Sequence, residues 1–125
     1  MERAASLSTD GTVLNDLALI YRRLGRLSDA VAALKRAAAA DDTLPHVYSN
    51  LGGMLQDSND LSGAEQAFRN AIRVQPDLIA AQYNLGALLA RIGRKEEALK
   101  YLQLVADSGD SNLRRLALDA IRKLR

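Results

Sequence analysis

Cysteine and tryptophan are absent from this sequence of 125 residues. Without cysteine there is no disulfide framework, no thiol nucleophile and no cysteine-ligated zinc, which fits a reducing compartment without proving one. Aromatic residues make up only 4% of the chain, although 48% of it is hydrophobic. The core must therefore be built from leucine and alanine at helical spacing, and this composition favours an all-α fold in one domain of ordinary size.

Long apolar runs and a strong excess of charge are also missing. No stretch approaches the ~20 consecutive apolar residues that cross a bilayer, and residues 1–20 lack the apolar centre of a signal peptide. We therefore expect a soluble, cytoplasmic chain without membrane insertion, which could still be a piece of a longer protein. Because 17 Lys and Arg stand against 15 Asp and Glu, the formal net charge of +2 is too small to imply a polyanionic partner.

Residues that could carry chemistry are few. A Ser-His-Asp triad would depend on His46 alone, and a single histidine of this kind is typical of a solvated surface residue. The adjacent pair Asp41 and Asp42 does not converge on one substrate bond. Gly52 and Gly53 follow no strand, so they lack the context of a phosphate-binding loop. We predict that the chain is not an enzyme, has no metal site, cofactor or small-molecule substrate, and acts through its surface.

One set of residues between Tyr48 and Pro76 organises the rest of the chain. Its members are Tyr48, Leu51, Gly52, Leu55, Ala64, Phe68, Ala71 and Pro76. Several of them recur at an interval of 34 residues: Leu17, Leu51 and Leu85; Ala18, Gly52 and Gly86; Ala30, Ala64 and Ala98. The pattern resembles the tetratricopeptide repeat, a helix–turn–helix unit of 34 residues. Some positions depart from it, because Gln82 replaces an aromatic residue and Asp42 and Asp110 replace the proline.

The resemblance implies a right-handed α-solenoid of three tetratricopeptide repeats and a C-terminal capping helix, all within one domain spanning residues 1–125. Its parts are an N-terminal arm at 1–10, repeats at 11–44, 45–78 and 79–112, and the capping helix at 113–125. The arm matches no part of the repeat and could be a remnant of a preceding helix. The last segment carries an apolar stripe from Leu113 to Leu124 among five cations, which suits a helix that covers the end of an array. A truncated fourth repeat is the alternative interpretation.

Turn and capping signals divide the repeats into helices. We expect Thr9 or Asp10 to cap the first helix, and Asp77 to cap the helix that follows Pro76. Ser62 and Glu65 stand three residues apart, the spacing of a reciprocal capping arrangement, so a helix is predicted to begin there. The residues predicted to end helices with a positive φ are Gly25 and Gly93. Small residues at Ala18, Gly52 and Gly86 are predicted to allow close approach of the two helices of each pair.

The first helix of the second repeat has a polar face formed by the residues that do not point inward. The residues 34 positions earlier and later form the equivalent faces of the first and third repeats. The resemblance implies that these faces line a concave groove in which an extended peptide lies. The candidate groove residues are Asn15, Asp16, Leu19, Arg22, Arg23, His46, Ser49, Asn50, Gln56, Asp57, Tyr83, Asn84, Ala87 and Arg91. A solvated face without a partner is the alternative.

The side chains of the groove indicate which kinds of tetratricopeptide array this chain resembles. In repeat arrays that bind the acidic C-terminal tails of chaperones, two asparagines and several cations form a clamp. Of the clamp positions here, which are Asn15, Leu19, Asn50, Ala80 and Asn84, only Asn50 fits. Asn50 and Asn84, with Asp16 on the same line, look like the asparagine ladder of the O-GlcNAc transferase repeat region, whose amides can hold a peptide backbone. The rim cations expected to add a preference for acidic residues are Arg22, Arg23 and Arg91.

We therefore predict a non-catalytic protein–protein interaction module that binds a peptide or protein segment as an adaptor or assembly scaffold, either monomeric or weakly self-associating. One alternative is a helical-repeat RNA-binding module, in which each repeat reads one base. The small charge excess does not favour a strand of phosphates, so nucleic acid is not the expected partner. Another alternative is a scaffold that assembles by end-to-end stacking through the exposed edge of the first repeat or the capping stripe.

Overall fold

The computed structural model describes residues 10–125, and the regular elements of this part are helices. Their bounds are α2 (Gly11–Arg23), α3 (Leu27–Ala40), α4 (Pro45–Asp57), α5 (Leu61–Val74), α6 (Ile79–Arg91), α7 (Lys95–Ala106) and α8 (Ser111–Leu124). The chain divides into two compact units, Met1–Val74 and Gln75–Arg125. Apart from Asp10, the N-terminal arm predicted for residues 1–10 lies outside the described residues.

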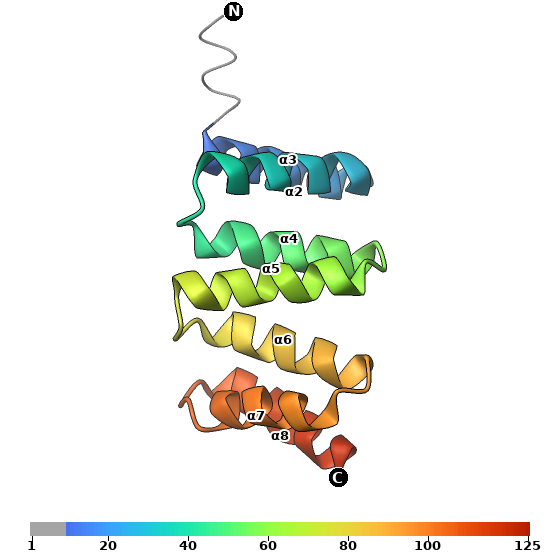
Figure 1. Cartoon of the computed structure of the whole chain (residues 1–125), viewed down its shortest axis with the longest axis vertical. Coiled ribbons are helices and arrows are strands. Elements are labelled where there is room, and N and C mark those ends of the chain that lie inside the picture. Colours follow the sequence, from blue (N-terminus) through green and yellow to red (C-terminus); the bar gives the residue numbers. More distant parts are fainter. Residues whose placement is uncertain (1–9) are drawn as a thin grey trace, which may run out of the picture. The chain divides into compact units, whose positions relative to one another are not determined.

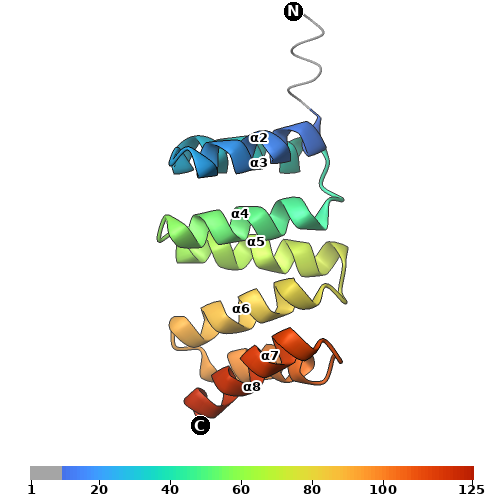
Figure 2. The ribbon, with the colours of Figure 1, turned by 180° about the vertical axis from the view of Figure 1, so that it is seen from behind.

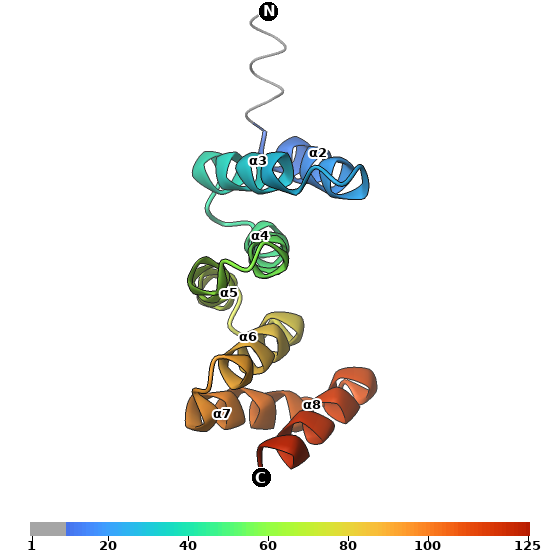
Figure 3. The same cartoon turned by 90° about the vertical axis from the view of Figure 1, so that its right-hand side faces the viewer.

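The first unit consists of two helical pairs. Helix α2 packs against α3, α4 packs against α5, and the pairs meet where α3 and α2 contact α4. Figure 3 shows the two helices of each pair next to one another, and Figure 1 shows the pair α2–α3 followed by the pair α4–α5. Leucine and alanine supply most of the buried side chains, as the composition predicts, and the largest fully buried residue is Phe68 on α5.

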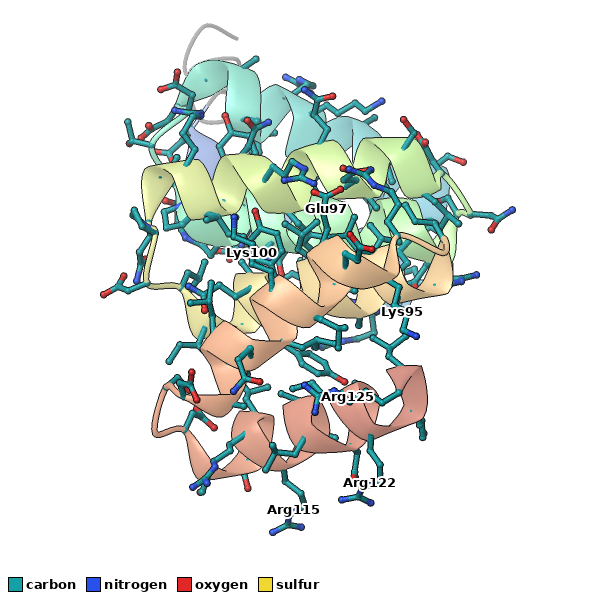
Figure 4. The ribbon with its side chains drawn as sticks, turned by 60° about the horizontal axis from the view of Figure 1, so that its bottom comes forward. Lys95, Glu97, Lys100, Arg115, Arg122 and Arg125 are labelled. Atoms are coloured by element: carbon teal, nitrogen blue, oxygen red, sulfur yellow. The ribbon has the colours of Figure 1, made fainter. Side chains whose placement is uncertain are left out.

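The second unit consists of the pair α6–α7 and the single helix α8, which packs against both members of the pair. Figure 2 shows α8 beside α7 at the end of the chain. Ala117 and Ile121 are the buried residues of α8. Arg115 and Arg122 point away from α7, as Figure 4 shows. The buried side of α8 is narrower than the predicted stripe, because Leu116 remains 46% exposed.

Several predicted helix ends are confirmed. The Asp10 carboxylate caps α2 by accepting hydrogen bonds from the backbone N–H groups of Thr12 and Val13. Gly25 and Gly93 have φ values of +79° and +87°, the left-handed conformation that glycine adopts at least cost. These short signals are readable in the sequence because they depend on neighbouring residues alone.

Two capping predictions were wrong. Helix α5 begins at Leu61, and its cap is Asp60, which accepts a hydrogen bond from the backbone N–H of Gly63. The turn before it is completed by Asn59 with φ +67°, so the chain enters the helix earlier than the Ser62 signal predicts. The N-cap of α6 is Leu78 without a side-chain hydrogen bond, so Asp77 does not cap it.

The close approach of paired helices depends on the predicted small residues. A Cβ atom added to Gly52 would lie 2.5 Å from Cε1 of Phe68 on the facing helix α5. In the third pair, a Cβ on Gly86 would lie 3.0 Å from Cγ and Cδ2 of Leu102 on α7. Ala18 is fully buried at the matching position of the first pair. Each pair therefore places a small residue where its two helices pack closely, as the 34-residue register predicts.

Candidate peptide-binding face

The first unit presents a polar face on α2 and α4, the first helix of each pair. We call it the α2–α4 face and define it by Asn15, Asp16, Leu19, Arg22 and Arg23 on α2 and His46, Ser49, Asn50, Gly53, Gln56 and Asp57 on α4. Asn15 is buried, whereas the remaining members are exposed or half-buried. The two helices contact each other, so the face is continuous between the first and second pairs.

An amide pair joins the two helices within this face. Nδ2 of Asn50 donates a hydrogen bond of 2.9 Å to Oδ1 of Asn15, and Asn15 is only 6% exposed. The predicted line joins Asp16 and Asn50 as equivalent positions one repeat apart, and it names no contact partner for Asn50. The observed partner lies 35 residues away. Residues that share a register position belong to equivalent sides of their helices, whereas contact is made between the facing sides of α2 and α4.

An ion pair between α2 and α4 has the same separation in sequence and lies about two helical turns further along both helices. Nη2 of Arg22 lies 3.1 Å from Oδ2 of Asp57, again 35 residues away, and both side chains are about half exposed. An exposed pair of this kind contributes roughly 0–1 kcal/mol. The ion pair nonetheless neutralises Arg22, one of the cations expected to select acidic ligands. Arg23 forms no ion pair within residues 10–125.

The other α4 members of the face differ in their accessibility. His46 is exposed and Gln56 is half-buried. Ser49 carries a buried Oγ that has no hydrogen-bond partner within the described residues. Gly53 has open space around it, since a Cβ atom added there would meet nothing within 4 Å. Gly53 therefore offers a position where a larger side chain would project over the face.

Four predicted groove residues lie on α6 in the second unit. Tyr83, Asn84 and Ala87 are half-buried, and Arg91 at the end of the helix is exposed. Their participation in a common groove stays a prediction.

The requirements of a metal site and of a membrane-spanning helix can be compared with the described residues. Within residues 10–125, no three His, Cys, Asp or Glu side chains gather in a way that could hold a metal ion. No helix in that range is both long and apolar enough to cross a membrane. Near the turn between α3 and α4, the hydroxyl and then the backbone N–H of Thr43 donate hydrogen bonds to the Asp41 carboxylate and lower its pKa.

The chain belongs to the tetratricopeptide repeat family. Two sequence models of this family match it, one over residues 11–40 and the other over residues 54–112. Domains of the family are in general interaction modules without catalytic activity. The resemblance inferred from the 34-residue pattern and the all-α helical-repeat fold is therefore confirmed.

Curated relatives share only a segment with this chain. It is 34% identical to Protein O-mannosyl-transferase Tmtc1 of Drosophila melanogaster over 99 residues, which are 75% of this chain and 12% of that protein. It is 32% identical to Protein FlbA of Caulobacter vibrioides over 85 residues, which are 68% of this chain and 14% of that protein. The chain thus spans about an eighth of the length of these relatives, and their names describe the full-length proteins.

Solved structures of similar fold include two with bound peptides. The first repeat domain of Spaghetti (RPAP3) with the HSP90 peptide SRMEEVD has a TM-score of 0.85 at 21% identity, covering 94% of this chain and 91% of that one. The Yersinia enterocolitica secretion chaperone SycD with a peptide of the translocator YopD has a TM-score of 0.83 at 16% identity, covering 89% and 88%. At these identities the likeness establishes the fold.

Proposed function

We propose that this chain is a non-catalytic protein-interaction module, an adaptor or assembly scaffold that binds an extended peptide segment on the α2–α4 face. In this proposal the pairs α2–α3, α4–α5 and α6–α7 are three repeats, and α8 is the capping helix. The observation that carries the proposal is the amide pair of Asn15 and Asn50. Each amide offers one acceptor oxygen and two N–H donors, so their mutual bond leaves donors and an acceptor for a peptide backbone.

The bound peptides of the similar structures support this class of ligand. Both of those proteins share the fold of this chain and hold a peptide from another protein. Their ligands are not transferred to this chain, because a likeness at 16–21% identity establishes the fold alone. What carries over is the geometry of a helical repeat, in which main-chain recognition requires only a few well-placed polar groups.

Charge on the face argues for a ligand segment of low net charge. The ionised members are Asp16, Arg22, Arg23 and Asp57, whose formal charges cancel. Arg22 is already paired with Asp57, which weakens the preference for acidic residues expected from the cations alone. A face of zero formal charge also gives no electrostatic support to RNA binding. We therefore expect affinity for the peptide to change little with salt.

The test begins with an unbiased selection of peptides on the intact chain and then blocks the face at Gly53. We expect Gly53→Trp to abolish binding of a selected peptide, because the new side chain projects over the face from a position with free space around its Cβ atom. The matched control is Gln66→Trp, which adds the same group to an exposed position on α5. Equal affinity of the two variants in fluorescence polarisation would refute the proposed site.

A second variant asks whether the amide pair itself binds the peptide. Asn50→Ala removes side-chain hydrogen bonds worth about 0.5–1.5 kcal/mol each, so affinity should fall roughly two- to tenfold. Circular dichroism must first establish that the helices persist, since Asn50 also bonds to the buried Asn15. An unchanged affinity in a folded Asn50→Ala chain would assign the binding to other members of the face.

A further inference from the structure

The outer side of α2, which faces away from α3 and α4, carries an exposed apolar stripe. Its members are Val13, Leu17, Ile20 and Leu24, the last being the C-cap residue. Val13, Ile20 and Leu24 are 42%, 53% and 66% exposed, and Leu17 is half-buried. They follow one another at intervals of four, three and four residues, which places them along one side of a helix.

The same positions in the next repeat form a contact between repeats. One period after Val13 and Ile20 stand Val47 and Met54 of α4, both 0% exposed, and α4 packs against α3 of the preceding pair. The apolar stripe of α2 is therefore equivalent to a surface that is covered in the second repeat. Among residues 10–74, the described part of the first unit, nothing covers this stripe on α2.

Two charged residues border the stripe, and they too stand at contact positions. Asp16 and Arg23 are one period before Asn50 and Asp57, and these α4 residues bond back to Asn15 and Arg22 of the preceding repeat. Asp16 and Arg23 are exposed and form no ion pair within the described range. The outer side of α2 thus combines the apolar and polar parts of a contact between repeats.

We propose that this surface binds a second copy of the chain, with the two α2 helices antiparallel across a two-fold axis. The argument for a second copy is the self-complementary charge of the surface. A two-fold axis perpendicular to the plane that contains both helix axes makes the helices antiparallel. It also brings the border with Asp16 and Arg23 in one copy next to the same border in the other. Asp16 and Arg23 lie on the same border. With the axis midway between them, between Leu19 and Ile20, each meets the oppositely charged residue of the partner, and both ion pairs form.

The same axis aligns the apolar stripe of one copy with the apolar stripe of the other. Its midpoint, between Leu17 and Ile20, lies within one residue of the midpoint between Asp16 and Arg23. Val13 of one copy then lies near Leu24 of the other, and the central Leu17 and Ile20 pack together. An interface of one short helix per copy is at the small end of specific interfaces, so the dimer should dissociate on dilution.

Sedimentation equilibrium of the whole chain across a range of concentrations tests the proposal. We expect reversible association from 13.6 kDa to twice that mass, without larger species. Ile20→Ser should weaken dimerisation roughly tenfold or more, because both copies lose apolar contact. Leu118→Ser on α8, at a residue 40% exposed, is the matched control and should leave the dimer unchanged.

Charge reversal gives a signature specific to the antiparallel pairing. Asp16→Arg and Arg23→Asp should each weaken self-association, since like charges then meet. A mixture of the two single variants, and the double variant Asp16→Arg/Arg23→Asp, should both associate like the original chain. A monomer at all concentrations, growth beyond the dimer, equal sensitivity to Leu118→Ser, or failure of the mixture to associate would each overturn the proposal. Growth beyond the dimer would indicate head-to-tail stacking instead.

Discussion

The two compact units close their cores in different ways. In the first unit two complete pairs pack on each other, and the large ring of Phe68 fills the space opposite Gly52. In the second unit one pair is covered by the single helix α8, which buries only Ala117 and Ile121 and carries cations on its other side. A lone amphipathic helix can thus do what a second pair does, provided that its outer side is charged.

The largest expected effect is the removal of α8. Truncation after Asp110 should destabilise the second unit by more than the roughly 2–5 kcal/mol that shortening one buried isoleucine costs, because the sides of α6 and α7 covered by α8 become exposed. Urea denaturation followed by circular dichroism measures the loss, and light scattering detects the expected aggregation. A truncated chain that remains monomeric and equally stable would show that α8 is a dispensable tail.

A smaller effect is expected from adding one methyl group at the helix crossings. Gly52→Ala should destabilise the chain by about 1–3 kcal/mol, since its Cβ would clash with the aromatic ring of Phe68. Gly86→Ala should cost less, because the nearest atoms of Leu102 are half an ångström further away. Gly53→Ala should stabilise the chain by about 0.5–1 kcal/mol, as it relieves the cost of glycine within a helix and meets no neighbour.

Free energies of unfolding of these three variants, measured in urea, test the comparison between the crossings. Gly52 and Gly53 provide the most direct control, because they are adjacent in α4 but only Gly52 faces a close neighbour, Phe68. If Gly52→Ala and Gly53→Ala changed stability equally, the close packing of α4 on α5 would be refuted. Combining Gly52→Ala with Phe68→Leu should cost less than the sum of the single changes, because the smaller side chain makes room for the methyl group.

The N-terminal caps of α2 and α8 can be compared by their contributions to the free energy of unfolding, which are about 1 kcal/mol each. Asp10 accepts two backbone hydrogen bonds at the start of α2, and Asp110 accepts one from Leu113 at the start of α8. Asp10→Ala and Asp110→Ala should each cost about 0.5–2 kcal/mol, with the larger value at Asp10. Thermal unfolding by circular dichroism measures both, and a larger loss at Asp110 would contradict the expected order.

The smallest effect concerns the turn between α3 and α4. Hydrogen bonds from Thr43 lower the pKa of Asp41, so the charged carboxylate stabilises the folded chain above its ordinary pKa, and this contribution is lost as pH falls through the lowered value. Thr43→Val removes the hydroxyl donor, and the pKa should move back towards its ordinary value. A carbon-13 NMR titration follows it directly, and an unchanged pKa would exclude the hydroxyl as the main cause.

Much of the fold could be predicted from spacing alone. Ala18, Gly52 and Gly86 recur at an interval of 34 residues because each crossing of paired helices needs a small residue, and that need leaves a periodic pattern in the sequence. The turns at Gly25 and Gly93 were predictable for a similar reason, since φ depends on local sterics. The caps predicted at Ser62 and Asp77 were wrong because the path of the turn decides which residue stands at the start of each helix. That residue is Asp60 for α5, and for α6 it is Leu78, which makes no side-chain hydrogen bond.

The candidate site was less predictable than the fold. The repeat register identified the polar side of α2 and α4, but it aligned Asp16 with Asn50 without naming the partner of either, and it left Arg22 as an available cation. The structure pairs Asn50 with Asn15 and Arg22 with Asp57. A repeat period relates equivalent positions, whereas hydrogen bonds form between facing ones, and the offset between the two depends on how the helices are packed.

The sequence by itself determined the helical repeat, its 34-residue period, the small residues at the crossings and the absence of cysteine chemistry, because each of these follows from local propensity or from side-chain size. Tertiary structure alone decided which polar groups pair, and that the outer side of α2 remains exposed while its counterpart on α4 is buried. The physical reason is that burial and pairing depend on the neighbour a residue receives. Equivalent residues in successive repeats can have the same pattern and receive different neighbours.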